Sequence, residues 1–562
     1  MCFLCDLANQ RAQAAATGVD KVSLSLKEGA QKLLQANASW TYNNNFTTIV
    51  TYGFRSGAPD YNVSQSDLPN TFERVSISEM AIIREAIRAW SNVADIRFVE
   101  VNPGGYSDNA AILFGNYSSK TDGSNGFAYY PRSKNTAGSS SEGDVWLNNF
   151  DGGFFDVKLG NYDFLTILHE IGHALGLSHP GNYNAGRGVT NTYAANAEFK
   201  EDTLQYSVMS YFKASELGAQ HGSQYATTPL LLDMIAIQQL YGQNKTGTSG
   251  DDVYGFNSTQ GPAYSLKNAS DVAVFSIWDS GGIDTLDVSQ YVVNQSISLV
   301  EASFSDIGGL TRNISVAAGA VIENARGGSG HDIITGNFAK NFLWGGAGDD
   351  QISGGGGHDA LYAEAGDDRL SGGFGDDLLD GGAGHDVAVY LSRRADYAAS
   401  KLSDRIIVTD RIANRDGVDT LVFIERIEFT DGDLVFDVVG ARAPAAYRLY
   451  GGAFDRTPDE GGFRYWAAVL EANAPLRDVA ASFIASTEFV TLYGTGLTNA
   501  SFVDALYRNV LDRPGDEGGV LFWNRALDQK SAERADVLVE FTQLPEYVGI
   551  SMADVSNGYW VA

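Results

Sequence analysis

The sequence predicts a multidomain protein: a mixed α+β domain, then an all-β parallel β-roll, then a small all-α domain. Three observations predict this order. Helical and strand patterns surround a histidine-rich motif in the first part, consecutive nine-residue glycine–aspartate repeats fill the middle, and a helical segment is duplicated at the end. The expected parts are an N-terminal segment at 1–35, the α+β domain at 36–245, the β-roll with a β-sandwich at 246–440, a linker at 442–446 and the helical domain at 447–562.

Composition restricts the class of partner. The formal net charge is -30 and the isoelectric point is about 4.5, so nucleic acids and anionic membranes would be repelled. No apolar run is long enough to be a transmembrane segment, and residues 1–30 lack the apolar core of a cleavable signal peptide. Export by a Sec-type signal is therefore not expected.

Two elements of the first domain are predicted from local pattern. Residues 79–93 carry Met80, Ile83, Ile87 and Trp90 at helical spacing, after a Ser78 cap. Residues 125–131 follow a glycine-rich loop and end in proline, which suits an edge strand.

The stretch HEIGHALGLSHP at 169–180 predicts a catalytic zinc site. His169 and His173 are four residues apart, so both imidazoles project from one face of a helix. Gly176 permits the left-handed backbone that ends a helix, which brings His179 round as a third ligand. Three protein ligands leave one position for water, and Glu170 is placed to accept its proton. The pattern predicts one zinc ion and peptide-bond hydrolysis.

The extended motif and the following Ser207-Val208-Met209-Ser210-Tyr211 turn form the metzincin signature. From about 38 to 389 the chain resembles serralysins, secreted bacterial zinc endopeptidases, through stretches such as AIRAWSNVADIRFVEV, TPLLLDMIAIQQLYG and DDVYGF. The resemblance implies protein or peptide substrates, Met209 as an apolar floor beneath the zinc, and Tyr211 as a phenol that ligates the metal and then holds the oxyanion. A buried, hydrogen-bonded tyrosine is the alternative for Tyr211. The substrate would pair with the edge strand, at Phe127, Ala128, Tyr129 and Tyr130.

Seven consecutive nine-residue units fill residues 327–389, and most of them match GGxGxDxUx, the calcium-binding repeat of RTX proteins. Glycines permit a tight turn, the sixth-position acid supplies charged oxygen, and the eighth position is buried. Units two apart should stack and share calcium, whereas a flexible linker would not keep acid and aliphatic positions in phase. The expected ligands are Asp332, Asp350, Asp368 and Asp386 on one side, Asn341, Asp359 and Asp377 on the other, and the glycines Gly328, Gly330, Gly346, Gly348, Gly355, Gly357, Gly373 and Gly375. The eighth positions are Ile334, Leu343, Ile352, Leu361, Leu370, Leu379 and Ala388. Residues 278–287 resemble a further calcium loop of serralysins, with Asp284 and Asp287.

The last part duplicates a unit, because LYGGAFDRTPDEGGFRYW at 449–466 matches LYRNVLDRPGDEGGVLFW at 506–523. We expect a helix, a D-R-x-x-D-E-G-G loop locked internally or by calcium, and a second helix. The unit resembles a helical domain of RTX and surface-layer-associated proteins, which implies attachment to a cell surface, a surface layer or a partner. The acidic and apolar end at 554–562 resembles the signal read by a type I secretion transporter. The alternative is that residues 559–561 pack onto the helical domain.

Several alternatives remain open at this stage. Cys2 and Cys5 could provide a thiol that keeps a precursor latent, or they could be incidental in a propeptide-like segment that is removed on maturation. The protein could also be a calcium-dependent surface-binding or adhesive protein with a vestigial protease domain, or a zinc amidase. Retention of all three histidines, Glu170 and Tyr211 favours an active protease.

Overall fold

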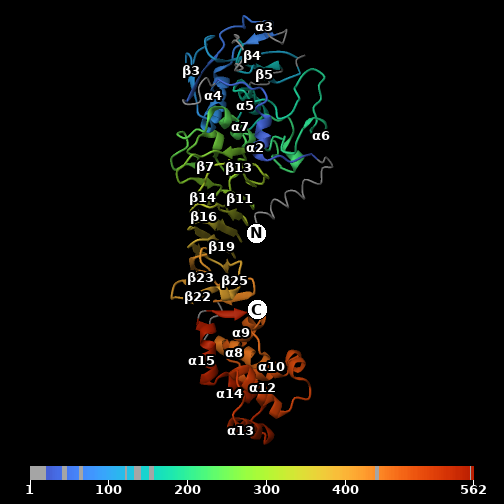
Figure 1. The fold of residues 1–562 in the computed structure, drawn as a ribbon, viewed down its shortest axis with the longest axis vertical. Helices are drawn as coiled ribbons and strands as arrows, with labels where there is room; N and C mark the ends of the chain where they lie inside the picture. Colours follow the sequence, from blue (N-terminus) through green and yellow to red (C-terminus); the bar gives the residue numbers. More distant parts are fainter. Residues whose placement is uncertain are drawn as a thin grey trace. The chain divides into compact units, whose positions relative to one another are not determined.

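The computed structural model describes residues 21–40, 47–61, 68–120, 123–131, 141–150, 157–436, 442–556 and 558–561. The chain divides into two compact units, Met1–Gly348 and Asp349–Ala562 (Figure 1). Cys2 and Cys5 lie outside the described residues. No helix in the described ranges combines the length and apolar character needed to cross a bilayer.

The first unit begins with a mixed sheet in the order β3-β1-β4-β6-β5. Strands β3, β1, β4 and β6 run parallel, whereas β5 is antiparallel to β6 and forms an edge of the sheet, as the sequence predicted. The strands are β1 (Thr48–Phe54), β2 (Phe72–Glu73), β3 (Ile96–Glu100), β4 (Ile112–Tyr117), β5 (Gly126–Ala128) and β6 (Val145–Asn148). The helices are α2 (Leu26–Lys32), α3 (Leu68–Thr71), α4 (Ile77–Val93), α5 (Tyr162–Ala174), α6 (Tyr193–Asn196) and α7 (Leu231–Tyr241), with the 3-10 turn η3 (Ala214–Leu217).

Helix α4 supports the helix that carries the histidine motif. It begins two residues earlier than predicted because Ser76, not Ser78, is the N-cap and forms a capping box with Glu79. The predicted apolar face is confirmed, since Met80, Ile83, Ile87 and Trp90 are all buried. The Trp90 indole N–H donates to the Leu168 carbonyl at 3.1 Å, so this face also fixes the position of α5.

The first unit continues into short strands that pair mostly in parallel. One row has the order β8-β7-β10-β14-β16, a second pairs β11 with β15, and a third has the order β12-β13-β9. Their bounds are β7 (Val253–Phe256), β8 (Ser265–Leu266), β9 (Phe275–Ile277), β10 (Thr285–Asp287), β11 (Ser296–Ser298), β12 (Phe304–Ser305), β13 (Ile314–Val316), β14 (Asn324–Arg326), β15 (Ile333–Thr335) and β16 (Phe342–Ala347), with η4 (Pro262–Tyr264).

The second unit opens with two rows of strands, β17-β19-β21-β25-β26-β27 and β18-β20-β24-β23-β22. The strands of the repeats pair in parallel, with Ile352 opposite Leu370 and Leu361 opposite Leu379. Eighth-position side chains are buried throughout both units, which confirms their predicted core role. The bounds are β17 (Gln351–Gly356), β18 (Ala360–Ala365), β19 (Arg369–Phe374), β20 (Leu378–Asp380), β21 (Val387–Val389), β22 (Tyr397–Lys401), β23 (Ile406–Asp410), β24 (Val418–Val422), β25 (Arg426–Phe429), β26 (Gly432–Val435) and β27 (Tyr559–Val561), with η5 (Arg394–Asp396).

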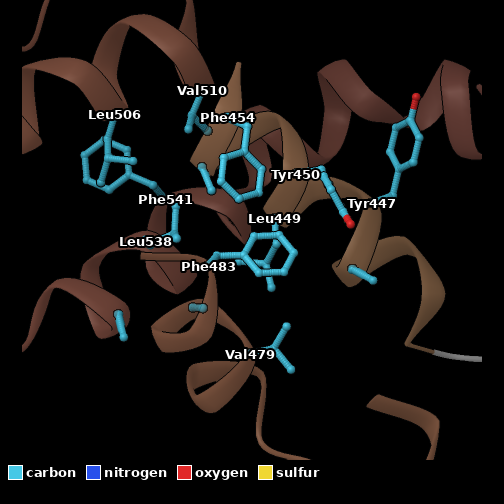
Figure 2. Close-up of a cluster of buried hydrophobic side chains, with 14 of the residues drawn as sticks. Tyr447, Leu449, Tyr450, Phe454, Val479, Phe483, Leu506, Val510, Leu538 and Phe541 are labelled. Atoms are coloured by element: carbon cyan, nitrogen blue, oxygen red, sulfur yellow. The ribbon is translucent and has the colours of Figure 1, made fainter. Parts of the chain in front are cut away.

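Eight helices follow in the described part of the second unit, and they share one aromatic and aliphatic core. Figure 2 shows Phe454 and Phe483 facing each other, with Leu506 and Phe541 beside them. The rings of Phe454 and Phe483 stack at 5.0 Å. The helices are α8 (Ala443–Phe454), α9 (Glu460–Glu471), α10 (Leu476–Ile484), α11 (Thr487–Tyr493), α12 (Asn499–Leu511), α13 (Glu517–Asp528), α14 (Arg534–Thr542) and α15 (Pro545–Ser556).

Two predictions for the helical part were wrong in detail. The proposed linker at 442–446 is mostly the first turn of α8, because Pro444 is tolerated in a first turn. The D-E-G-G segments are not loops but helix starts. Asp459 and Asp516 cap α9 and α13 by accepting the backbone N–H groups of Gly462 and Gly519.

The C-terminal residues 559–561 form strand β27, which pairs antiparallel with β26. Tyr559 also contacts the rings of Tyr447 and Phe463 in the helical core. Residues 559–561 therefore pack onto both the helical part and the preceding sheet, as the alternative interpretation expected.

The adjacent isoleucines of β15 provide a stability test of the repeat core. Ile334 is 0% exposed and Ile333 is 45% exposed. Ile334→Ala should lower the free energy of unfolding by about 2–5 kcal/mol, because it leaves a cavity in a packed row. Ile333→Ala should cost less than about 1 kcal/mol. Denaturant unfolding at constant calcium measures both, and equal losses would contradict the assigned core.

Candidate metal centre and active site

Helix α5 carries the first two histidines on a fully packed backbone. Asn161 caps the helix by accepting the Phe164 N–H at 2.9 Å. A Cβ on Gly172 would lie 2.5 Å from the Met209 sulfur, so glycine is needed for the methionine turn to approach the helix. The helix that carries the HExxH motif therefore packs closely against the methionine turn at Gly172.

The three histidines converge on one point. The Nε2 atoms of His169 and His173 each lie 3.1 Å from the Nε2 atom of His179. Each Nδ1 faces a backbone carbonyl: His169 faces Val208 at 2.8 Å, His173 faces Leu177 at 2.6 Å, and His179 faces Tyr183 at 2.7 Å. A carbonyl only accepts, so every Nδ1 must carry the proton and every Nε2 presents a lone pair to the shared point.

Burial keeps these imidazoles neutral. It lowers the pKa of His169 to about 4 and that of His179 to about 3, and it lowers the pKa of His173 well below its ordinary value. Neutral imidazoles are the form that binds a metal ion. This donor set of three converging Nε2 atoms fits zinc.

The turn after α5 brings His179 into place. Gly176 has a φ of +108°, and a Cβ at this residue would collide with the Ala38 carbonyl oxygen. Both the left-handed backbone and the close approach therefore require glycine, as the motif predicted. The Tyr241 hydroxyl donates to the Leu175 carbonyl at 2.6 Å and fixes the same turn from α7.

Glu170 lies beside the histidines and beneath the edge strand β5. Its side chain is buried, and a Cβ on Gly126 would lie 3.3 Å from its Cγ. Tyr130 contacts the His173 ring edge-on at 5.5 Å. Burial and then the Glu170 charge raise the pKa of Tyr130, so the carboxylate and this phenol share one environment.

Tyr211 lies over the histidine cluster. Its ring centroid is 4.6 Å from that of His179 and 5.6 Å from that of His169. Its hydroxyl accepts the Ala185 N–H at 3.3 Å. Burial, followed by the Glu170 charge, raises the pKa of Tyr211, which keeps the phenol protonated at neutral pH.

The methionine turn, residues 207–211, is held by two buried acids that sequence reasoning missed. Asp233 accepts the Ser207 hydroxyl at 2.6 Å and the Val208 N–H at 2.7 Å. Asp202 accepts the Ser210 hydroxyl at 2.7 Å. Asp202 lies in the stretch KEDTLQ and Asp233 in TPLLLDM. Neither stretch has the spacing of a catalytic or metal-binding motif, so the contacts in the structure reveal the role of these acids.

The edge strand exposes alternate backbone groups. Asn125 and Tyr129 bond with β6 and its flanking residues, through the Asn125 carbonyl and the Tyr129 N–H. Alternation along a strand therefore directs the backbone groups of Gly126, Ala128 and Tyr130 away from β6. Of the predicted ledge, Phe127 and Tyr129 place their rings in an aromatic cluster with Trp146.

A second acidic group is formed in the first unit by Asp252, Asp279 and Asp284, whose ligand atoms lie within 4.8 Å of one another. Burial, with the charges of neighbouring acids, raises the pKa of Asp284 to about 8. The structure thus brings Asp284 into a cation-type cluster. Asp287 instead accepts the Ser289 hydroxyl at 2.6 Å and lies outside this group.

The repeat acids of the second unit form two rows. In each row a backbone N–H donates to the carboxylate of the next acid: Asp350 to Asp368 at 2.6 Å, Asp368 to Asp386 at 2.9 Å and Asp359 to Asp377 at 2.8 Å. The remaining Oδ2 atoms of Asp368, Asp377 and Asp386 are buried and have no hydrogen-bond partner within the described ranges.

Both rows continue beyond the repeats. Asp386 N–H donates to Glu425 at 2.8 Å, and Asp377 N–H donates to Asp419 at 3.0 Å. The sequence pattern missed these acids because they are not nine residues from the last repeat. In the first unit, Asp332 accepts the Gln295 N–H at 2.7 Å in the same manner.

Asn341, Gly328 and Gly330 differ in their local structure from the other predicted repeat ligands. The Asn341 side-chain amide donates to the Glu323 carbonyl at 2.9 Å and accepts the Asn337 N–H at 2.8 Å, so its hydrogen bonds stabilise this turn. Positive φ values occur at Gly346, Gly348, Gly355, Gly357, Gly373 and Gly375 but not at Gly328 and Gly330. At Gly328 a Cβ would instead collide with the Tyr291 carbonyl oxygen.

Comparison with protein families agrees with this arrangement. Residues 59–204 match the family described as Matrixin, and residues 243–439 match the family described as Peptidase M10 serralysin C terminal. Residues 480–550 match a domain of unknown function, DUF4214.

Curated relatives match more than half of the chain. Metallopeptidase AprA of Pseudomonas marginalis is 41% identical over 331 residues, covering 58% of this chain and 67% of the relative. Metalloprotease AprA of Pseudomonas entomophila is 40% identical over 344 residues, covering 60% of this chain and 69% of the relative. Serralysin of Proteus mirabilis is 43% identical over 304 residues, covering 52% and 60%. The chain therefore belongs to the serralysin-like metzincin metallopeptidases.

Proposed function

We propose that this protein is a secreted zinc-dependent endopeptidase that hydrolyses peptide bonds of extracellular or surface proteins. One observation carries the proposal: three neutral imidazoles aim Nε2 at one point, beside a buried glutamate and a protonated phenol. Zinc bound there by His169, His173 and His179 would acidify a water molecule and polarise the substrate carbonyl. The adhesive alternative is not favoured, because the whole catalytic set is assembled.

The chain's own residues divide the remaining work. Glu170 accepts the proton of the attacking water and returns it to the leaving amine. The hydrogen bond from the Ala185 N–H to the Tyr211 hydroxyl breaks, and the phenol then donates a hydrogen bond to the oxyanion. Met209 packs beneath the histidines and keeps the floor of the site apolar.

The substrate backbone would pair with the outward groups of β5. Gly126, Ala128 and Tyr130 direct their N–H and carbonyl groups away from β6, so an extended peptide can add as a further strand. Main-chain pairing requires little of the substrate side chains, which is consistent with a broad specificity.

The repeats would form a calcium-binding β-roll. Parallel pairing, positive-φ glycines and buried Oδ2 atoms support this proposal. Divalent cations bind carboxylate and carbonyl oxygen, and several calcium ions would balance the rows of acids. The expected ligands are Asp332, Asp350, Asp359, Asp368, Asp377 and Asp386, with Asp284 in the separate group. For Asn341 and Asp287 the hydrogen bonds described above support a structural role instead.

The proposed domains are a propeptide-like segment at 1–35, a catalytic domain at 36–245, a β-roll region at 246–440 and a helical domain that starts with α8 at Ala443 rather than at 447. Calcium-triggered folding after export by a type I transporter would suit such a chain. The helical domain would attach the enzyme to a cell surface or surface layer.

Replacing the glutamate tests the chemistry. Glu170→Gln should retain zinc but lower kcat by roughly 10²–10⁴-fold, because the general base is lost. Glu216→Gln, outside the site, is the control and should keep full activity. Peptidase assays with metal analysis measure both, and a zinc-loaded Glu170→Gln enzyme of normal activity would disprove the role.

Tyr211→Phe tests the oxyanion donor. Turnover should fall by roughly 10²–10³-fold with a smaller change in KM, since the hydroxyl acts in the transition state. The control is Tyr193→Phe. The Tyr193 hydroxyl donates a hydrogen bond to the Lys200 carbonyl, and Tyr193 belongs to the neighbouring aromatic cluster. Equal turnover in both variants would reduce Tyr211 to packing.

Calcium removal should unfold the repeat region, because clustered carboxylates repel one another. Burial raises the pKa of Asp368 to about 6 and that of Asp386 to about 7. In calcium-free protein the folded state then binds more protons than the unfolded state between pH 4 and 7, so its stability falls as pH rises through this window. Circular dichroism of dialysed protein should show more β-structure at pH 5 than at pH 8. Saturating calcium should remove the difference, and a calcium-free spectrum that is unchanged by pH would contradict the proposal.

A further inference from the structure

One of the three histidines, His169, is oriented by a carbonyl group 39 residues away, whereas the other two are oriented by carbonyl groups four residues further along the chain. His173 is oriented by Leu177, within the turn that ends its own helix. His169 is oriented by Val208 of the methionine turn, and His179 by Tyr183 in the loop that follows it. The Leu177 N–H donates to the Gly172 carbonyl at 2.9 Å, so Leu177 is tied to the helix itself. Val208 and Tyr183 lie outside helices and strands and are held by other groups.

Asp233 fixes the Val208 peptide. Its carboxylate is 0% exposed and accepts three donors: the Ser207 hydroxyl at 2.6 Å, the Val208 N–H at 2.7 Å and the Leu230 N–H at 2.9 Å. The Val208 carbonyl then accepts from His169. Ser207 in turn accepts the Met209 N–H at 3.0 Å, so the acid also orders the peptide group that carries the Val208 carbonyl.

Asp202 fixes Tyr183 from the opposite end of the same turn. It is also 0% exposed, and one oxygen accepts both the Tyr183 hydroxyl and the Ser210 hydroxyl at 2.7 Å. The Tyr183 ring stacks on the His179 ring at 5.3 Å with an interplanar angle of 13°. Tyr183 therefore holds His179 by both its ring and its carbonyl, and Asp202 holds Tyr183.

We propose that Asp233 and Asp202 are positioning residues for the metal centre, Asp233 acting on His169 through Val208 and Asp202 acting on His179 through Tyr183. The proposal rests on the zinc function proposed above. The two carboxylates accept hydrogen bonds from Ser207 and Ser210, the first and fourth residues of the methionine turn. The turn therefore helps to position two zinc ligands, His169 and His179, in addition to forming an apolar floor.

The primary test is zinc affinity of the full, calcium-saturated protein, measured by competition with a chromophoric chelator. Asp233→Asn and Asp202→Asn should each weaken zinc binding by roughly 10–100-fold, as loss of an outer partner of a metal ligand does. The matched control is Asp144→Asn. Asp144 is 1% exposed and paired with Arg55 and Tyr61, with no side-chain contact to the histidines.

A cobalt-loaded sample gives a readout that does not depend on activity. The visible absorption bands of the Asp202 and Asp233 variants should differ from wild type in position or intensity, because ligand orientation has changed. The Asp144 variant should match the wild type even where it melts at a lower temperature. Variants that melt early but keep wild-type zinc affinity and cobalt spectra would overturn the proposal.

A milder variant covers the case in which an asparagine variant does not fold. Tyr183→Phe removes only the hydroxyl that meets Asp202, and should weaken zinc binding by about 10-fold. In a double-variant cycle, Tyr183→Phe should add nothing to Asp202→Asn, whereas Asp233→Asn should add fully. Independent effects at Tyr183 and Asp202 would disprove the relay. If the wild type itself bound no zinc, the proposed function would fail instead.

Discussion

Three hydrogen bonds from histidine Nδ1 atoms to backbone carbonyls decide what the active site can do. They select one tautomer for each ring, and that tautomer leaves the three Nε2 lone pairs facing a common point. Burial adds to this selection, because a charged imidazolium would be poorly solvated there. Gly172, Gly176 and Gly126 follow from the same constraint: each permits a segment to approach the histidine helix or its glutamate more closely than a side chain would allow.

The repeats rest on the opposite principle, since their defining contacts are unfavourable by themselves. Asp368, Asp377 and Asp386 each accept a backbone N–H with one carboxylate oxygen, and their other oxygen is enclosed with no hydrogen-bond partner within the described ranges. Such groups cost free energy unless a cation or a proton compensates them. The apolar eighth positions supply the favourable term, so stacking and charge compensation are both needed for the parallel rows to persist.

Sequence reasoning identified the parts of this architecture that have a fixed spacing. The histidine helix and the buried eighth positions follow from spacings of four and nine residues, the methionine turn from the extended motif, and the edge strand from a glycine-rich loop and a closing proline. Asp202, Asp233, Asp419 and Glu425 could not be found in this way, because their partners are distant in sequence and irregularly spaced. Helix boundaries shifted by two residues at Ser76, where a capping box outweighed the nearer serine.

Strand β27 gives the second unit an unusual connectivity. The chain passes from β26 through all the helices and then returns to pair with β26 itself. Both ends of the helical part are consequently anchored at neighbouring strands, so it resembles an inserted subdomain more than a module on a single tether. Closing so long a loop carries an entropy cost. The final strand pair should therefore form late in folding, after the helices have shortened the distance between its partners.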